Sequence, residues 1–266
     1  MSETISNDDE QGDDVRRFYI SKSKFLWGLQ CPKLLWTAYH AKHLIPEPDA
    51  AQQAVFDQGH EVGALAKQLY PDGIEITASA TDLDETIRQT RQALRLRRPL
   101  FEAAFEPNRG YTRTDILVPV GEDQWDIVEV KSTTSLKDVH IDDLAFQTWV
   151  LTQAGLQVRR CSVLHINPDF VRRGPIDSLQ FFQIASSTTK VRQPFDQVED
   201  RLAGMLRAIS LPASPEITIG PHCDDPYTCP LHAYSGGCRT LIPISVGQRS
   251  DFSRTPFRFI SDSVPG

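Results

Sequence analysis

The stretch from Tyr111 to Lys131, YTRTDILVPVGEDQWDIVEVK, constrains the fold of this chain more than any other. Its first half alternates β-branched and apolar residues with polar ones, and Trp125–Val130 forms a second apolar run. Gly121–Asp123, between the two runs, is typical of a turn. We therefore predict a hairpin with one strand over 111–120 and a second over 125–130.

Charged side chains interrupt this apolar hairpin. Asp115 lies in the first strand, and Glu129 and Lys131 lie near the end of the second. Residues two apart on a strand point to the same face, and Asp115 can meet the other two across the strand pair. A surface hairpin with scattered charges is the alternative, but carboxylates among apolar strands are costly to bury unless they are paired or ligated. Two carboxylates beside a lysine suit a hard divalent cation that activates a water molecule.

The overall net charge excludes few classes of function, because the excess of acidic residues is concentrated at the N-terminus. The formal net charge of −7 includes six acids and no base in residues 1–14, and the rest of the chain has 28 basic and 29 acidic residues. We predict that residues 1–17 form a disordered acidic tail, which is too polar to be a secretory signal. No apolar run of about 18 residues exists, so no membrane span is expected. A near-neutral body neither demands nor forbids nucleic acid.

Helix and strand patterns alternate around the hairpin. The patterns predict a first helix from Ser21 or Ser23, with a turn or a helix restart at Cys31. They also predict helices over 50–70, 82–98, 141–153 and 195–209, and strands over 74–76, 100–105 and 157–166. This order indicates an α/β fold of three layers. We divide the chain into a helical N-terminal region (18–99), a core (100–210), a cysteine-rich segment (211–240) and an irregular tail (241–266).

The predicted helix over 50–70 carries Gly59 and His60 at its centre. A glycine inside a helix costs about 1 kcal/mol relative to alanine, so we expect Gly59 to allow the close approach of another group. His60 beside it is either a partly buried histidine with satisfied hydrogen bonds or a metal ligand.

The chain has five cysteines and no signal peptide, which favours a reducing, cytoplasmic setting over a disulfide framework. Cys223, Cys229 and Cys238 are spaced C-x5-C-x8-C among loop-forming residues, where packing does not explain them. Three thiolates leave a tetrahedral or cubane centre one ligand short. Cys31, at the break before a proline, is the natural fourth, whereas Cys161 fits a strand core.

The spacing does not choose between an iron–sulfur cluster and a structural zinc ion. Zinc satisfies the same ligand count, although its usual pair of cysteines two to four residues apart is missing. His222 and His232 offer alternative zinc ligands.

These motifs together resemble the RecB-type branch of the PD-(D/E)xK nuclease superfamily, in the form that carries an iron–sulfur cluster. The segments SKSKFLWGLQCPKLLW, FDQGHEVG, TRTDIL and EVK and the cysteines carry the resemblance, which covers residues 18–240. CRISPR-associated RecB-like exonucleases share this plan, and the opening segment is similar to that of an uncharacterised bacterial family with the same nuclease unit. The resemblance implies a restriction-endonuclease-like core with a mixed central sheet flanked by helices.

The resemblance also implies a role for single residues. The metal-binding histidine of the family falls on His60, its aspartate on Asp115, and its E-x-K motif on Glu129, Val130 and Lys131. Mg²⁺ or Mn²⁺ would be held by the histidine, the two carboxylates and the carbonyl of Val130. Asp115, Glu129 and Lys131 would act in catalysis.

A glutamine on the helix after the E-x-K motif completes the catalytic set of the family and falls on Gln147. The tyrosine that often follows it by one helical turn is absent, since Trp149 and Leu151 stand in that neighbourhood. This difference affects how the substrate is oriented and leaves the metal site unchanged.

The family's cluster cysteines match Cys31, Cys223, Cys229 and Cys238, which implies a structural [4Fe–4S] cluster that clamps the two ends of the chain. The implied activity is that of a metal-dependent deoxyribonuclease, an exonuclease that prefers single-stranded DNA. DNA is then a partner, with a helicase or another DNA-processing protein as a second. The family usually continues beyond this point, so residues 241–266 are either an irregular tail or the stub of a longer protein.

Two other classes of function stay open. One is a non-catalytic nucleic-acid-binding or adaptor module that keeps the fold and the metal centre. The other is an interaction domain stabilised by zinc.

Overall fold

The computed structural model describes residues 18–78 and 82–233, so the predicted tails 1–17 and 241–266 lie outside the described residues. Within the described ranges, seven strands form one mixed sheet in the order β2-β3-β4-β5-β6-β7, with β1 beside β4. The strands are β1 (Ile20–Ser21), β2 (Ile74–Glu75), β3 (Leu100–Phe105), β4 (Gly110–Val120), β5 (Gln124–Lys131), β6 (Gln157–Ile166) and β7 (Phe182–Ser186).

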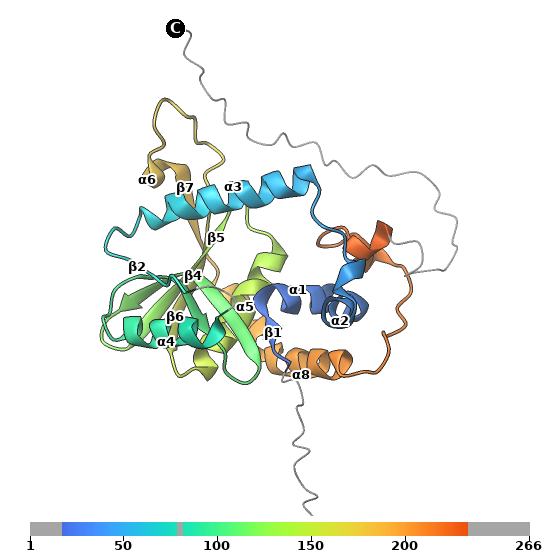
Figure 1. The fold of residues 1–266 in the computed structure, drawn as a ribbon. Helices are drawn as coiled ribbons and strands as arrows, with labels where there is room; N and C mark the ends of the chain where they lie inside the picture. Colours follow the sequence, from blue (N-terminus) through green and yellow to red (C-terminus); the bar gives the residue numbers. More distant parts are fainter. Residues whose placement is uncertain (1–17, 79–81, 234–266) are drawn as a thin grey trace, which may run out of the picture.

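The sheet mixes both kinds of pairing. The pairs β3–β4, β4–β5 and β6–β7 are antiparallel, whereas β1–β4, β2–β3 and β5–β6 are parallel. Helices flank this sheet, so the predicted α/β class with a mixed central sheet flanked by helices is confirmed (Figure 1).

The central hairpin is confirmed, and each strand begins one residue earlier than predicted. Its turn contains Gly121 at φ +55°, a left-handed conformation that glycine adopts without steric cost. Ile116 pairs with Val128 and Leu117 with Ile127, so directly opposite residues share a face. This register decides which side chains meet at the site.

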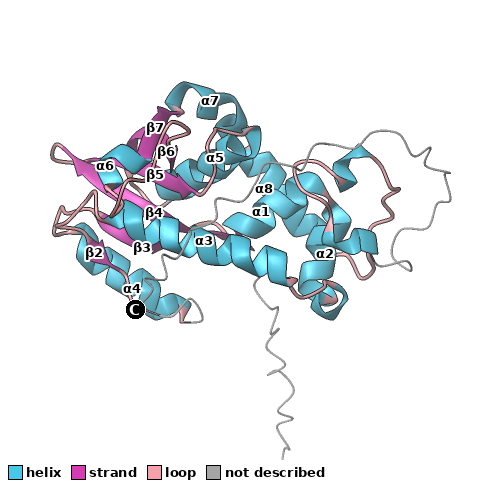
Figure 2. Ribbon diagram, turned by 90° about the horizontal axis from the view of Figure 1, so that it is seen from above, coloured by secondary structure: helices cyan, strands magenta, loops and turns pink. Residues whose placement is uncertain are grey.

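The helices are α1 (Lys22–Gln30), α2 (Pro32–His40), α3 (Ala50–Lys67), α4 (Leu83–Leu94), α5 (Asp138–Gln153), α6 (Ser178–Phe181), α7 (Thr188–Asp196) and α8 (Val198–Ile209). Short 3-10 turns lie at Lys42–Leu44, Pro221–Cys223 and Pro230–Ala233. Helix α3 crosses the sheet on one side and α4 lies on the other, while α1, α2 and α8 gather beyond one end of the sheet (Figures 1 and 2). None of the described helices combines the length and apolarity that crossing a membrane requires.

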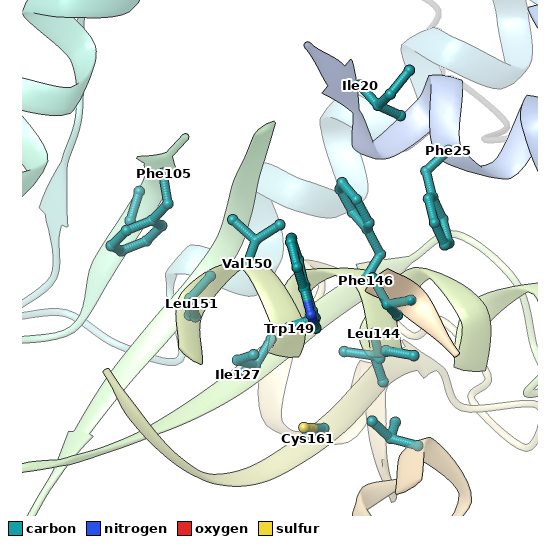
Figure 3. Packing of buried hydrophobic residues seen from close by; sticks show 14 of the residues in the cluster. Ile20, Phe25, Phe105, Ile127, Leu144, Phe146, Trp149, Val150, Leu151 and Cys161 are labelled. Atoms are coloured by element: carbon teal, nitrogen blue, oxygen red, sulfur yellow. The ribbon is translucent and has the colours of Figure 1, made fainter. Parts of the chain in front are cut away.

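The two faces of β5 are covered by different helices. Ile127 belongs to the buried cluster that contains Leu144 and Trp149 of α5, as Figure 3 shows. Val128, the next residue, belongs to a second cluster with Val62 of α3. Alternation along a strand therefore places the odd-numbered side chains of β5 toward α5 and the even-numbered ones toward α3.

Helix α1 is held against α5 by aromatic packing. Phe25 and Phe146 are both fully buried, and their rings stack with centroids 4.4 Å apart (Figure 3). Ile20 of β1, directly before α1, is also buried in this cluster and pairs with Gly110 of β4. The start of α1 is thereby held next to the beginning of β4.

Several predicted boundaries differ from the structure. The helix predicted over 50–70 ends at Lys67, and the strand predicted over 74–76 ends at Glu75. The helix predicted over 195–209 is two helices, α7 and α8, separated at Gln197, and α7 starts at Thr188. The helix predicted over 82–98 ends at Leu94, because Arg97 turns back at φ 48° and donates to three carbonyl groups of the hairpin turn. Helix α5 begins three residues earlier than predicted, at Asp138. Helix α6 and strand β7 were not predicted, since their segment is short and lacks a clear period.

Candidate active site and cysteine cluster

The candidate active site lies where β4 and β5 separate. The two strands are paired from Val120 opposite Gln124, next to the turn, to Ile116 opposite Val128. Beyond this last pair the strands separate, and β4 pairs with β1 instead. Asp115 is the next residue of β4 at this fork. Its Oδ2 accepts a hydrogen bond of 2.8 Å from the backbone N–H of Val130, which fixes the carboxylate across the gap.

Lys131 and Gln147 both bridge two buried carboxylates. The Lys131 Nζ donates to Glu129 Oε1 at 2.6 Å and to Asp143 Oδ2 at 2.7 Å. The Gln147 Nε2 donates to Glu129 Oε2 at 2.7 Å and to Asp143 Oδ1 at 2.9 Å. Glu129 and Asp143 are each only 1% exposed, and the two Gln147 bonds are buried, where a hydrogen bond is strengthened by the low dielectric, whereas the two Lys131 bonds are partly buried.

Two residues of the network, Asp143 and Lys22, were not predicted from the sequence. Asp143 lies one helical turn before Gln147, and this i, i+4 spacing places both on the face of α5 that meets β5. Lys22 opens α1, and its Nζ lies 2.8 Å from Glu129 Oε1, 3.8 Å from Asp115 Oδ1 and 3.9 Å from Asp143 Oδ1. The spacing could have revealed Asp143, but no local signal reveals Lys22, which is 107 residues from its partner Glu129.

Opposing electrostatic effects give the two hairpin carboxylates different proton affinities. Burial, followed by repulsion from Glu129, raises the pKa of Asp115 to about 7, although Lys22 and Lys131 counteract this. Burial also acts to raise the pKa of Glu129, but the ammonium groups of Lys131 and Lys22 outweigh it and hold that pKa below its usual range. Asp115 therefore holds a proton more readily than Glu129 does.

The two lysines keep their charge despite burial. Desolvation lowers the pKa of Lys131, but Asp143, Glu129 and Asp115 together raise it well above the ordinary value. The same three carboxylates raise the pKa of Lys22. Neither amine is a base at neutral pH in this arrangement.

The donor set suits a hard cation beside Asp115. Carboxylate oxygens are the ligands that Mg²⁺ and Mn²⁺ prefer, and the Lys22 ammonium already places a positive charge between Asp115 and Glu129. Over 18–78 and 82–233, no group of three or more His, Cys, Asp or Glu side chains is arranged to hold a metal ion.

His60 is not brought into this network. It is exposed on α3, whose buried residues Val62 and Ala66 pack in the cluster of Ile116 and Val128, on the other face of the sheet from Glu129. A Cβ added at Gly59 would meet nothing within 4 Å, so the expected close approach there was wrong. Metal ligation by His60 stays a prediction.

The described cysteines of the predicted centre lie together. Cys31, Cys223 and Cys229 are buried in one small cluster and line a cavity of about 10 Å³, beside His222. Cys31 comes from the break between α1 and α2, and the other two come from the segment after α8, which lies against α2 in Figure 1. Cys238 lies outside the described residues. A cavity of this volume has room for one atom of water size. Thiols are ligands that thiophilic metals prefer, but the three described cysteines are not among any group of side chains arranged to hold a metal ion in the described part of the chain.

Cys161 is separate from this cluster, as its sequence context predicted. It is buried in the main core on β6, and its Sγ lies 3.1 Å from the Thr148 Oγ1. Burial raises the pKa of its thiol, which keeps it neutral. It behaves as a small core residue.

The Gln147 side chain is expected to support both the fold and the site. Replacing it with leucine leaves one oxygen of Glu129 and one of Asp143 without a donor in a buried setting. We expect the free energy of unfolding to fall by about 2–4 kcal/mol, measured by urea denaturation. Gln153→Leu, near the exposed end of α5, is the matched control, and an equal loss in both variants would contradict the role of the Gln147 contacts.

Comparisons with solved structures return distant likenesses. An alkaline exonuclease from Laribacter hongkongensis, LHK-Exo, is 11% identical over 72% of this chain and 89% of that chain, with a TM-score of 0.31. LHK-Exo in complex with dAMP is 13% identical, over 73% and 91%, with a TM-score of 0.31. The protein SSO0001 is 13% identical, over 74% and 87%, with a TM-score of 0.31. No family model matches, and a search of curated proteins finds no significant match.

Proposed function

We propose that this protein is a metal-dependent nuclease that hydrolyses the phosphodiester bonds of DNA. The observation that carries the proposal is the network at the fork of β4 and β5, in which the Lys131 Nζ lies 2.6 Å from Glu129 Oε1 and the Lys22 Nζ lies 3.8 Å from Asp115 Oδ1. A carboxylate whose pKa is raised to about 7 beside a second, ionised carboxylate is an arrangement often found at active sites, and it supports the proposal. An exonuclease that prefers single-stranded DNA is the finer form of this proposal.

Each residue of the proposed site has its own role in the reaction. Asp115 and Glu129, with the carbonyl of Val130, would hold Mg²⁺ or Mn²⁺, which supplies Lewis acidity and a water of lowered pKa. Lys131 donates hydrogen bonds and positive charge to the negative charge that develops on the phosphate. Gln147 holds Glu129 and Asp143 in place, which fixes the direction of the Lys131 ammonium.

Cleavage of end-labelled DNA tests the proposal. Single- and double-stranded substrates are incubated with the protein in Mn²⁺, in Mg²⁺ and in excess chelator, and products are separated at nucleotide resolution. We expect metal-dependent release of mononucleotides or short fragments, faster from single strands. DNA that stays intact while the protein still binds it would instead support a non-catalytic nucleic-acid-binding module.

Metal affinity is expected to rise with pH through the pKa of Asp115. Its pKa is raised to about 7, so the carboxyl is mostly protonated at pH 6, and a metal ion must displace that proton. Ionisation increases about tenfold between pH 6 and pH 8, and the apparent affinity for Mn²⁺ should increase about tenfold with it. Calorimetric titration measures this change.

The carboxylate of Asp115 is the specific source of this pH dependence. A Glu75→Gln variant, which removes a surface carboxylate paired with Lys67, should keep the tenfold rise. Equal Mn²⁺ affinity of the wild-type protein at pH 6 and pH 8 would exclude Asp115 as the group that exchanges its proton for the metal.

We also propose that Cys31, Cys223, Cys229 and Cys238 hold a [4Fe–4S] cluster that joins the α1–α2 break to the segment after α8. The three described thiols around one cavity support a metal centre. A zinc ion held with His222 is the alternative, because the His222 Nε2 lies 3.6 Å from the Cys223 Sγ and the cavity is of single-atom size. Broad absorbance near 400 nm in anaerobic protein would favour the cluster, and colourless protein with stoichiometric zinc would favour zinc.

A further inference from the structure

The loop between β6 and α6, residues 167–177, begins at the same edge of the sheet as the candidate active site. Strands β5 and β6 are parallel, and Lys131 pairs with His165. Asn167, the first residue of the loop, is therefore two residues beyond the partner of Lys131, a distance of about 7 Å along a strand. Figure 1 shows the loop projecting beyond α3. A ligand bound at Lys131 can extend from the fork to this loop.

The base of the β6–α6 loop is fixed by side-chain contacts. The Asn167 Nδ2 donates to the carbonyl of Gln180 at 3.1 Å. The Asn167 Oδ1 accepts from the backbone N–H of Asp169 and from the Gln183 Nε2, both at 3.0 Å. The Phe170 ring packs edge-on against a ring of α6, with centroids 5.1 Å apart. These contacts determine where the tip of the loop lies relative to the sheet.

The tip of the loop, residues 171–173, presents one apolar and two basic side chains to solvent. Val171 is 69% exposed, and Arg172 and Arg173 are both exposed. The Arg172 Nε donates to the carbonyl of Gly174 at 3.0 Å, and Gly174 has a φ of +104°, which glycine adopts readily. Asp177, at the other end of the loop, accepts from the first turn of α6. The tip is therefore positively charged.

This combination matches the two chemical surfaces of a nucleic-acid strand. Guanidinium groups bind phosphate oxygens in a bidentate geometry, and apolar side chains at such interfaces pack against bases. The position of the loop agrees with this ligand, because it starts where β5 brings Lys131 to the edge of the sheet. The tip therefore fits a strand that passes from the fork across this edge.

We propose that the tip of the β6–α6 loop binds the nucleic-acid strand next to the point of cleavage, with Arg172 and Arg173 on its phosphates and Val171 against a base. The inference rests on the proposed function for the class of ligand, and it deepens that function by assigning a contact outside the fork. Phosphate contacts carry no sequence information, so binding at the tip does not depend on base sequence. The contact also requires no metal ion.

Binding of a fluorescent single strand of DNA in excess chelator tests this inference on the full chain without cleavage. The double variant Arg172→Gln with Arg173→Gln should bind about tenfold more weakly at low salt, because two charge-assisted contacts are lost. Each phosphate contact to a single strand contributes about 0.7 to the slope of log affinity against log salt, so the slope should become shallower by about 1.4. Fluorescence anisotropy measures both quantities.

Two matched double variants separate the position of the charge from its amount. Arg91→Gln with Arg95→Gln removes the same charge from exposed positions at the end of α4, on the other side of the sheet from α3, and should keep the wild-type slope. Arg172→Lys with Arg173→Lys keeps the charge of the tip and should also keep it. An equal loss in the α4 variant, or no DNA binding by the wild-type protein, would overturn the inference.

The base contact has its own test. Val171→Ser should weaken binding of an intact strand about threefold, because the apolar side chain no longer covers a base. The same variant should bind a strand that is abasic throughout as tightly as the wild-type protein does. An equal loss with the abasic strand would remove Val171 from the proposed contact.

Cleavage assays separate this inference from the proposed function. Wild-type protein that binds DNA through the loop tip, yet leaves end-labelled DNA intact in Mg²⁺ and Mn²⁺, would sink the nuclease proposal and leave the loop contact standing. Wild-type cleavage, with unchanged binding and cleavage by the Arg172→Gln, Arg173→Gln variant, would do the reverse.

Discussion

Lys131→Met is expected to reduce DNA cleavage by about 10²–10³-fold or more while the protein keeps its fold. The substitution preserves the aliphatic stem but removes the ammonium that donates to Glu129 and Asp143 at 2.6 and 2.7 Å. In the proposed reaction that ammonium meets charge that develops on the phosphate, so its loss should lower kcat more than it raises KM. Lys22 remains to compensate the two buried carboxylates, which limits the loss of stability.

Binding of Mn²⁺ distinguishes Lys131 from Asp115 in this experiment. Lys131→Met should still bind Mn²⁺, because its charge lies toward Asp143. Asp115→Asn should lose both Mn²⁺ binding and cleavage, because an amide is a poorer ligand for a hard cation than a carboxylate. Both variants should therefore lose cleavage, but only Asp115→Asn should also lose Mn²⁺ binding.

Lys67→Met is the control for the Lys131 experiment. Lys67 also forms a carboxylate contact of 2.6 Å, with Glu75, but on the surface, where such a pair is worth about 0–1 kcal/mol. This variant should cleave DNA like the wild-type protein. Full metal-dependent activity in purified Lys131→Met would rule out the assignment of the active site.

Cys229→Ser is expected to remove the metal centre and to lower the melting temperature by about 10 °C or more. Metal binding to thiolates contributes directly to folding free energy, and here the thiols join the α1–α2 break to the segment after α8. Loss of this connection should also loosen α1, which carries Lys22, so cleavage should fall at the same time. Iron, sulfide and zinc analysis, together with thermal denaturation, measures the effect.

Cys161→Ser is the matched control for the cysteine experiment. Cys161 is equally buried but lies in the core of β6, apart from the other three. This variant should keep its metal content and lose only the modest stability expected for a polar change in a core. If Cys229→Ser kept a full complement of iron or zinc, the centre would not be the one proposed.

Much of the fold could be predicted from local patterns. The hairpin strands were placed to within one residue, because alternation with a period of two and a glycine turn are both local signals. Strands β3 and β6 were predicted with the bounds that the structure has. The short β1 and β7 were missed, because strands of two and five residues gain their stability from neighbours distant in the sequence.

The candidate site was predictable only in part, for a similar reason. The meeting of Asp115, Glu129 and Lys131 follows from the pleat and the register of one hairpin. Gln147 was placed by resemblance, and the structure joins it to Glu129 by a hydrogen bond. His60 lies on a helix that packs on the opposite face of the sheet, and no local pattern reveals the face on which a helix packs.

The sequence by itself determined a hairpin with two carboxylates and a lysine, and a set of cysteines that packing does not explain. These are local properties, because a period of two, a turn and a spacing depend on neighbouring residues. Only the tertiary structure decided that Lys22 enters the carboxylate group and that Asp143 completes it. The physical reason is that Lys22 and Glu129, which are 107 residues apart in the sequence, come into contact only when α1 packs on α5. A local sequence pattern does not determine that packing.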